Sequence, residues 1–252
     1  MIDLSTLDRP PAGFAACVNC AYRQTGTPPI CFACASEHTE APPADACEVC
    51  DHPRPEGEPC GNPVCNWNDR YFTQVRAISM RTGQMEWAIS RYKYDGKTGW
   101  RAIFGRILAG YLNEHRELFE RYDAITPSPT FTGLGAERDF DHTRMIVEAA
   151  QIEEPIGWPF EYDLIVKDAA TERFAERGAV KPWRERKGIA EGPLRRALRI
   201  PNPRRVRGRR ILVFDDVFTE GFTIREVAKA MIDQGAVEVS EIVLARQPFR
   251  GG

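Results

Sequence analysis

Long hydrophobic runs are missing from this 252-residue sequence. No apolar stretch approaches the roughly 20 residues that a membrane-spanning helix needs. The first residues also lack the basic-then-apolar pattern of a secretory signal peptide. We therefore expect no membrane partner and a cytoplasmic location, in a compartment that keeps thiols reduced. With 42% hydrophobic residues, the composition is that of a globular chain of one or two domains.

Cysteine is absent after residue 65, and all eight cysteines lie between residues 17 and 65. Three of their four pairs have the CxxC spacing, in which two thiolates can hold one metal ion across a tight turn. Two such pairs complete a tetrahedral four-cysteine site, so the pattern predicts two structural zinc ions (Zn²⁺). Sequential grouping of the pairs is the simplest arrangement, and a crossed grouping stays open. The predicted metal ligands are Cys17, Cys20, Cys31, Cys34, Cys47, Cys50, Cys60 and Cys65.

Basic residues are scarce among residues 1–68, which carry three of them against nine acidic residues, a net charge of −6. This segment also has few large apolar residues, so bound zinc would have to supply its folding energy. Zinc ribbons often bind nucleic acid, but a surface this acidic repels phosphates. We therefore predict that residues 1–68 form a zinc-binding Cys-rich module that docks a protein partner.

Acidic residues are scarce between residues 167 and 210, which contain five of them and fifteen basic residues. The net charge of +10 requires an anionic partner or many counterions. Apolar content is low across 168–208, where Arg, Lys, Pro and Gly are frequent. We expect this stretch to form a basic hood that is mostly loop and partly mobile, with one or two short elements.

A short apolar run at 211–214 introduces the clearest motif in the chain. The run predicts a buried parallel strand, and Asp215 and Asp216 follow it at once. The next residues, 219–223, contain two threonines and a glycine, and a helix is predicted from residue 224. Backbone N–H groups of such a loop and of a helix N-terminus favour an anion, and the hydroxyls add donors. Because paired carboxylates suit ribose hydroxyls or Mg²⁺, the motif predicts a phosphate site beside a ribose or magnesium site.

Strand and helix patterns alternate along the rest of the chain after residue 70. This alternation predicts an α/β protein with a parallel sheet, which binds ligands at the carboxyl ends of its strands. The segment 84–94 fits either a strand or a helix. Strands are expected at 71–80, 123–129, 162–167, 211–214 and 237–245, and helices at 100–122, 134–150 and 224–234.

The stretch 215–223 resembles the phosphoribosyl-pyrophosphate (PRPP) signature of type I phosphoribosyltransferases. In that family the acidic pair contacts the ribose hydroxyls, and the loop after it holds the 5′-phosphate. Position 220 departs from the usual Thr or Ser. The Glu220 carboxylate either points away from a bound phosphate, or the chain binds PRPP weakly or takes another ligand. The resemblance implies a PRPP site made of Asp215, Asp216, Val217, Phe218, Thr219, Glu220, Gly221, Phe222 and Thr223.

The order of motifs along the whole chain is similar to that of the ComF family of phosphoribosyltransferase-like proteins. After the cysteines, residues 91–96 (RYKYDG) resemble a Lys-Tyr-x-Gly element, and residues 126–129 (TPSP) resemble a Val-Pro-Val-Pro loop. Residues 137–142 (ERDFDH) resemble a third family element. The resemblance implies a type I phosphoribosyltransferase-like domain at 69–252 behind a small four-cysteine zinc-ribbon module. It also places Ser128 in the loop where pyrophosphate binds. It implies Asp215, Asp216 and Arg138 as catalytic residues, with Arg138 neutralising the pyrophosphate.

The family implies two classes of function. One is Mg²⁺-assisted transfer of a 5-phosphoribosyl group from PRPP to a nitrogen nucleophile, with release of pyrophosphate. The other is non-catalytic: handling of single-stranded DNA through residues 167–210, or sensing of PRPP or a nucleotide. For DNA, Trp183 and Phe174 are the stacking candidates. The candidate pyrophosphate contacts are Lys167, Arg173, Lys181, Arg184, Arg186 and Lys187.

Overall fold

The computed structural model describes residues 39–54, 57–154, 156–172, 174–176 and 179–248. The first predicted zinc set, Cys17, Cys20, Cys31 and Cys34, lies outside the described residues, and so does Arg173. In the described part of the chain, no helix combines the length and the apolar character needed to cross a membrane.

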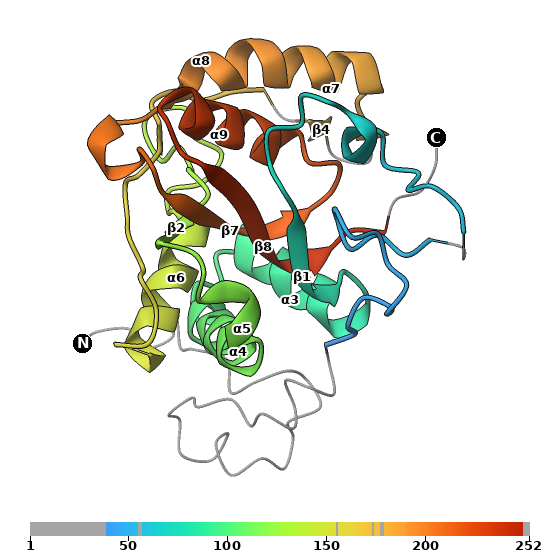
Figure 1. The fold of residues 1–252 in the computed structure, drawn as a ribbon, viewed down its shortest axis with the longest axis vertical. Coiled ribbons are helices and arrows are strands. Elements are labelled where there is room, and N and C mark those ends of the chain that lie inside the picture. The colour runs from blue at the N-terminus through green and yellow to red at the C-terminus, as the bar shows by residue number, and fades with distance from the viewer. Residues whose placement is uncertain (1–38, 55–56, 155, 173, 177–178, 249–252) are drawn as a thin grey trace, which may run out of the picture.

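Four parallel strands form the central sheet, in the order β1-β8-β7-β2 (Figure 1). Strands β7 and β8 pair along their whole lengths, from Arg210 opposite Glu238 to Phe218 opposite Arg246. Strand β2 stops earlier, since its last pair joins Pro127 to Phe214. The last residues of β7 therefore have a strand on one side only. The bounds are β1 Val75–Met80, β2 Ala124–Pro127, β7 Arg210–Phe218 and β8 Glu238–Arg246.

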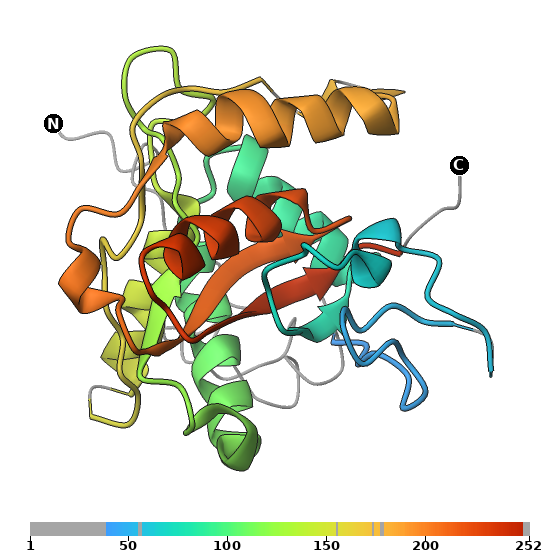
Figure 2. The same cartoon turned by 45° about the horizontal axis from the view of Figure 1, so that its top comes forward.

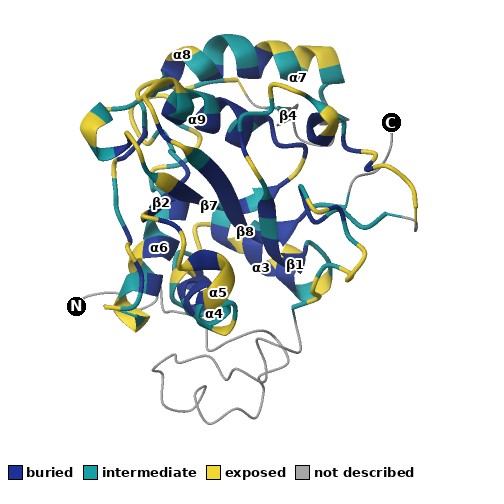
Figure 3. Cartoon of the chain, viewed as in Figure 1, coloured by how far each residue is buried: buried dark blue, intermediate teal, exposed yellow. Residues whose placement is uncertain are grey.

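One face of the sheet is covered by four helices. Because side chains alternate along a strand, Leu212 and Phe214 of β7 face this side and join the same buried cluster as Ile242 of β8. Tyr92 and Phe104 pack there from the helices, and Figure 3 shows buried and exposed residues side by side along this layer. The helices are α3 (Gly83–Tyr94), α4 (Trp100–Glu114), α5 (Arg116–Phe119) and α6 (His142–Glu153).

The other face of the sheet carries α9 (Phe222–Asp233) together with the second set of cysteines. Ile211 and Val213 point to this side and join one buried cluster with Val64. Val64 belongs to the short 3-10 helix η3 (Pro63–Asn66). The predicted fold class is therefore confirmed, as a parallel sheet flanked by helices with a four-cysteine cluster in the N-terminal region. The boundary between domains at residue 68 stays a prediction.

The basic stretch was expected to be mostly loop, and this expectation was wrong in one respect. A helical run covers residues 183–197 and lies across α9 (Figure 2). Its buried residues Ile189, Ala190, Leu194 and Ala197 form an apolar stripe that the overall polarity of the stretch conceals. The run consists of α7 (Trp183–Ile189), the π-helical turn η4 (Ala190–Leu194) and α8 (Arg195–Ala197).

Short elements complete the basic stretch and correct one predicted strand. The strand expected at 162–167 is reduced to β3 (Val166–Lys167), which lies outside the central sheet and pairs antiparallel with β6 (Leu198–Arg199). Tertiary pairing with a distant segment decided its partner, which no local pattern specifies. The remaining elements are β4 (Ala175–Glu176), β5 (Ala179–Val180) and the 3-10 helix η5 (Pro203–Arg205).

Two predicted helices begin or end at other residues than expected. The helix expected at 100–122 breaks at His115, whose φ of −113° and ψ of 38° are not helical, so α4 and α5 are separate. The helix expected at 134–150 begins only at residue 142, because the Asp141 side chain caps it by accepting a hydrogen bond from the Arg144 N–H at 3.0 Å. The undecided segment 84–94 is helical, as α3.

The close packing of α4 on α6 yields a test of the fold. A Cβ added at Gly105 would lie 2.5 Å from the Ala149 Cβ and 2.7 Å from the Ala150 nitrogen. We expect Gly105→Ala to force the helices apart and to lower the free energy of unfolding by about 1–3 kcal/mol in urea denaturation. Gly188→Ala in α7 is the matched control, since its Cβ would meet open space and should be neutral or stabilising. Equal losses in both variants would contradict the close contact.

Candidate functional site

The acidic pair lies where β7 continues past the end of β2. Asp215 and Asp216 follow Phe214, which makes the last β2–β7 pair, while β8 still pairs with β7 beyond them. The expectation that the strand ends at residue 214 was wrong, because pairing with β8 extends it to Phe218. Asp216 is 2% exposed and Asp215 is partly buried. Two carboxylates thus occupy the open step at the carboxyl end of the sheet.

A lysine and a histidine from the helical layer reach Asp216. The Lys93 Nζ lies 2.7 Å from the Asp216 Oδ2 and donates to its Oδ1 at 3.0 Å. The His142 Nε2 lies 3.5 Å from the same Oδ2. Lys93 comes from the last turn of α3, and His142 is the first residue of α6. The elements at 91–96 and 137–142, distant in sequence, therefore meet at the acidic pair.

The protonation states of these groups differ. Burial alone would raise the pKa of Asp216, but the Lys93 ammonium holds it well below its usual range. Burial and the adjacent charge of Asp216 raise the pKa of Asp215 to about 7. Burial lowers the pKa of His142 to about 3, so its imidazole is neutral. Asp216 is therefore ionised throughout the neutral pH range, whereas Asp215 gains or loses its proton near neutral pH.

The loop after β7 turns at Gly221, whose φ of 89° is strained for any residue with a side chain. Gly221 precedes the first turn of α9, so backbone N–H groups of a helix N-terminus lie directly after the acidic strand. Thr219 is exposed and Thr223 is partly buried. Val217, Phe218 and Phe222, also predicted to bind PRPP, pack their side chains into the protein interior. From these three residues, a ligand at the loop would meet mainly backbone.

The Glu220 side chain is turned toward the helical run above α9. Its carboxylate forms an ion pair with Arg186 of α7, and Glu220 is only 8% exposed. This carboxylate therefore has a basic partner, and the alternatives that the sequence left open for position 220 stay predictions. Because the pair neutralises the charge, Glu220 does not present a bare carboxylate at the loop.

Ser128 and Arg138 also lie beside the acidic pair. The Ser128 hydroxyl hydrogen-bonds to Asp215, and the Ser128 N–H donates to the Phe214 carbonyl at 2.7 Å. The Arg138 Nε donates to the Lys93 carbonyl at 3.1 Å, and its guanidinium lies 5.3 Å from the centre of the Tyr94 ring. The structure thus brings together residues that the sequence placed in one site from four separate segments.

Two acidic-site residues were missed by sequence reasoning. Lys93 was given no role in the site, although the 91–96 motif that contains it was the available signal. The sequence offers no such signal for Glu241 of β8. Glu241 is 2% exposed, its Oε2 has no hydrogen-bond partner among the described residues, and burial with the nearby Asp215 and Asp216 raises its pKa well above the usual range. In the sequence it is one of several polar residues of a predicted strand.

The second cysteine set converges on one point. The ligand atoms of Cys47, Cys50, Cys60 and Cys65 all lie within 4.8 Å of one another, and all four residues are buried. The Cys50 and Cys60 sulfurs are 3.7 Å apart. A tetrahedral Zn²⁺ with bonds of about 2.3 Å would separate its sulfurs by roughly 3.8 Å. The four thiols therefore fit zinc, and they match the sequential grouping.

Comparison with known proteins supplies the family. No protein-family model matches the chain. Among curated proteins, "Competence protein ComFC" of Streptococcus pneumoniae (strain ATCC BAA-255 / R6) is 30% identical over 174 residues, which cover 68% of this chain and 67% of that protein. The chain belongs to the ComF family.

Two solved structures show a weaker likeness to this ComF-family chain. One is the "structure of the allosteric regulatory enzyme of purine biosynthesis", with a TM-score of 0.32 at 20% identity. The other is glutamine PRPP amidotransferase from B. subtilis complexed with ADP and GMP, with a TM-score of 0.34 at 22% identity. Each match covers 57% of this chain but only 25% and 26% of the solved chains. Likenesses at these scores add no weight to any function.

Most basic candidates of this ComF-family chain bind its own side chains. Lys181 pairs with Glu185, and the Lys167 Nζ donates to the Thr171 hydroxyl at 2.7 Å. Lys187 lies over Trp67 and pairs with Glu191, whereas Arg184 is exposed. Among these candidates, only Arg186 has a described contact with the phosphate-type loop, through Glu220.

The aromatic candidates for DNA stacking also have partners within the chain. Trp183 and Phe174 both pack against Phe222, at ring-centre distances of 6.1 and 6.0 Å. Trp67 contacts Trp183 edge-on at 5.6 Å. These rings hold α7 over the start of α9, so in this conformation they form an internal cluster.

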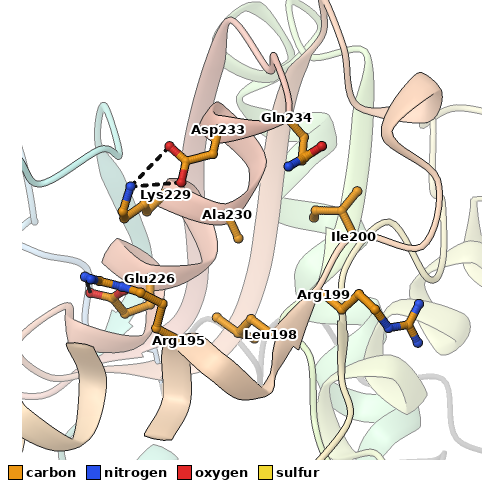
Figure 4. Close-up of a pocket in the computed structure, with 9 residues that line it drawn as sticks. All are labelled: Arg195, Leu198, Arg199, Ile200, Glu226, Lys229, Ala230, Asp233 and Gln234. Atoms are coloured by element: carbon orange, nitrogen blue, oxygen red, sulfur yellow. Dashed lines mark hydrogen bonds and ion pairs between the residues drawn. The ribbon is translucent and has the colours of Figure 1, made fainter. Parts of the chain in front are cut away.

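A surface pocket of about 340 Å³ opens against the C-terminal half of α9 (Figure 4). Two ion pairs lie within it, Arg195 with Glu226 and Lys229 with Asp233, and Arg199 pairs with Asp168 outside it. None of the residues predicted to bind PRPP lines this pocket. The pocket is therefore separate from the acidic site.

The raised pKa of Asp215 predicts how stability depends on pH. A folded-state pKa of about 7, above an unfolded value of roughly 3.9, means that the folded state holds this proton more tightly. This carboxyl should therefore reduce stability progressively as pH rises from about 4 to 7, with the full loss above pH 7. Asp215→Asn removes the charge, so at pH 8 it should exceed the wild-type free energy of unfolding by more than about 1 kcal/mol.

Urea denaturation at pH 5 and pH 8, with zinc bound and no added Mg²⁺, measures this effect. The gain from Asp215→Asn should be smaller at pH 5, where the wild-type carboxyl is mostly protonated. Asp233→Asn is the control, because Asp233 is exposed at the far end of α9 and should show no such pH dependence. A gain that is equal at both pH values would contradict the raised pKa.

Proposed function

We propose that this ComF-family chain binds PRPP, or a related phosphorylated ribose, at the carboxyl end of β7 and transfers its phosphoribosyl group to a nitrogen nucleophile. One observation supports the proposal above all. The Asp215–Asp216 pair occupies the open step of the sheet and leads within five residues to the N-terminus of α9. Acceptors for sugar hydroxyls and donors for a phosphate are thus adjacent, at the edge of the sheet where α/β proteins bind ligands.

The residues divide into two groups by the part of the ligand that they would hold. The first-turn N–H groups of α9, with the hydroxyls of Thr219 and Thr223, are donors for a 5′-phosphate. Asp215 and Asp216 are acceptors for ribose hydroxyls. Arg138 adds positive charge near the acids, since it contributes to the depressed pKa of Asp216. In this assignment, Ser128 positions Asp215 through its hydroxyl.

A magnesium ion fits the same acids. Ligand atoms of His142, Asp215 and Asp216 lie within 4.8 Å of one another, and carboxylate oxygens suit Mg²⁺. When bound, Mg²⁺ would supply positive charge to the departing pyrophosphate. Lys93 already supplies a positive charge to Asp216, which keeps this carboxylate ionised before any ligand arrives.

In the proposed transfer, the bond from the ribose C1 to the pyrophosphate oxygen breaks and its electron pair leaves with pyrophosphate. A C1–N bond forms, and the nucleophile loses a proton. The described site offers one group whose pKa is close to neutral, Asp215, and this carboxylate can accept that proton. His142, with a pKa of about 3, is a weak base and serves better to orient Asp216.

Calorimetry with PRPP and Mg²⁺ tests the proposal directly. We expect Asp215→Ala/Asp216→Ala to weaken binding by at least about tenfold, because the ribose loses both acceptors. Asp233→Ala, an exposed acid at the other end of α9, is the matched control and should bind as wild type does. A pyrophosphate assay with candidate amines and nucleobases then tests transfer.

The outcomes of this experiment separate three functions. Binding with pyrophosphate release supports the transferase. Binding without release for any acceptor supports a sensor of PRPP or a nucleotide. No binding at millimolar PRPP would contradict a PRPP site altogether.

A second candidate function is the handling of single-stranded DNA. It is favoured by the competence relative and by exposed arginines of the basic stretch, namely Arg184, Arg196, Arg204 and Arg207. Because Trp183 and Phe174 pack inside the chain, such binding would rely on charge more than on base stacking.

Salt-dependent binding of a single-stranded oligonucleotide tests the DNA candidate. If the exposed arginines contact phosphates, Arg204→Ala/Arg207→Ala should reduce the slope of log K against log salt by about one to two units. Arg144→Ala is the control, because Arg144 is a half-exposed arginine on α6, outside the basic stretch. Equal slopes for wild type and both variants would exclude this surface.

A further inference from the structure

The four-cysteine cluster and the phosphate-type loop touch each other through a buried asparagine. The Asn62 N–H donates to the Cys60 sulfur at 3.4 Å, and its Nδ2 lies 3.9 Å from the Cys50 sulfur. The same Nδ2 donates to the Glu220 carbonyl at 3.3 Å. Asn62 is fully buried, at 0% exposure. One residue therefore joins two cluster thiols to the backbone of the loop, Cys60 through its backbone N–H and Cys50 through its side chain.

A buried arginine makes a second link between the same two parts. Arg246, the last residue of β8, donates from Nε to the Cys50 carbonyl at 2.9 Å. Its Nη1 donates to the Thr219 carbonyl at 2.8 Å, and its guanidinium lies 4.7 Å from the centre of the Phe218 ring. Arg246 is also fully buried. Its charge is thus held between the turn at Cys50 and the loop.

Packing completes the contact. A Cβ added at Gly221 would lie 2.8 Å from the Phe218 ring and 3.5 Å from the Val64 Cγ1. Val64 is fully buried in η3, between Cys60 and Cys65. The loop therefore lies close to the segment between Cys60 and Cys65, and a side chain at position 221 would crowd the Phe218 ring.

The direction of these hydrogen bonds matters for the ligand. In a planar trans peptide, the carbonyl and the next N–H point in opposite directions. The Thr219 and Glu220 carbonyls point toward Arg246 and Asn62, so the N–H groups of Glu220 and Gly221 point away from the cysteines. Anchored carbonyls on one side thus present two donors on the other, the arrangement that a backbone anion site needs.

We propose that the metal centre at Cys47, Cys50, Cys60 and Cys65 sets the conformation of loop 218–221 through Asn62 and Arg246, so that metal occupancy controls ligand affinity at the loop. The part on affinity rests on the proposed function. Metal binding fixes the turns at Cys50 and Cys60, which fixes Asn62 and the Cys50 carbonyl. Asn62 and Arg246 are positioning residues, since they act through the loop backbone.

Hydrogen exchange measures the loop without any ligand. The Arg225 N–H donates to the Gly221 carbonyl at 3.0 Å and the Gln247 N–H to the Phe218 carbonyl at 2.9 Å, so both amides report on the loop. Removal of Zn²⁺ from the full chain by a chelator should speed the exchange of both by about tenfold or more. Amides of α4 are the internal reference and should change less than twofold.

Asn62→Leu separates the link from the metal itself. The variant keeps all four thiols and similar volume but loses the donor to Glu220. We expect it to retain zinc by mass spectrometry, to speed exchange of the Arg225 and Gln247 amides, and to weaken PRPP binding by about three- to tenfold. Asn113→Leu is the matched control. It loses comparable half-buried hydrogen bonds to Glu154 and Trp158 on the far side of the sheet and should change neither readout.

The results separate this proposal from the proposed function. Faster loop exchange on zinc removal and in Asn62→Leu, with no PRPP binding by the zinc-loaded wild type, would support the coupling and overturn the PRPP site. Unchanged exchange of both amides after chelation would overturn the coupling, whatever PRPP does. If Asn62→Leu loses its zinc, chelation of the wild type decides alone.

Discussion

The parallel pairing of β7 with β8 over nine residues is the constraint on which the site depends. Because β2 ends at Pro127, this pairing alone carries β7 past the rest of the sheet and places Asp215 and Asp216 at an open step. It also puts Arg246 opposite Phe218, beside the loop that follows. The sheet thus delivers an acidic pair, a helix N-terminus and a buried guanidinium to one edge.

Electrostatics at this edge favour function over stability. Asp215, Asp216 and Glu241 crowd three acids into the sheet, and burial with mutual repulsion raises the pKa of two of them. Lys93 forms an ion pair with Asp216, and its charge also opposes part of the rise in the pKa of Asp215. A cation or hydroxyl donors would reduce the repulsion among these carboxylates. A ligand that supplies both would therefore be stabilised at this edge of the sheet.

The cysteine cluster is part of the hydrophobic core and is not a detached appendage in the described part of the chain. Its four cysteines share one buried cluster with Val213 and Val243 of the sheet. Asn62 and Arg246 then extend this contact to the loop that starts α9. Glu220 belongs to the same picture, because its carbonyl bonds to Asn62 while its carboxylate pairs with Arg186 on the opposite helical run.

Local patterns in the chain were enough to predict the α/β class, a buried strand at 211–214 directly before the acidic pair, and the four-cysteine grouping at residues 47–65. These features follow from periodicity and short-range spacing, which the chain encodes within a few residues. The family was predicted from the resemblance of motifs along the chain. Folding in three dimensions was needed to bring Lys93 and His142 to Asp216, to pair Glu220 with Arg186, and to lay the helical run 183–197 on α9. Lys93 and Asp216 are 123 positions apart in the sequence, and Arg186 and Glu220 are 34 positions apart. Contacts over such separations leave no periodic pattern in either segment.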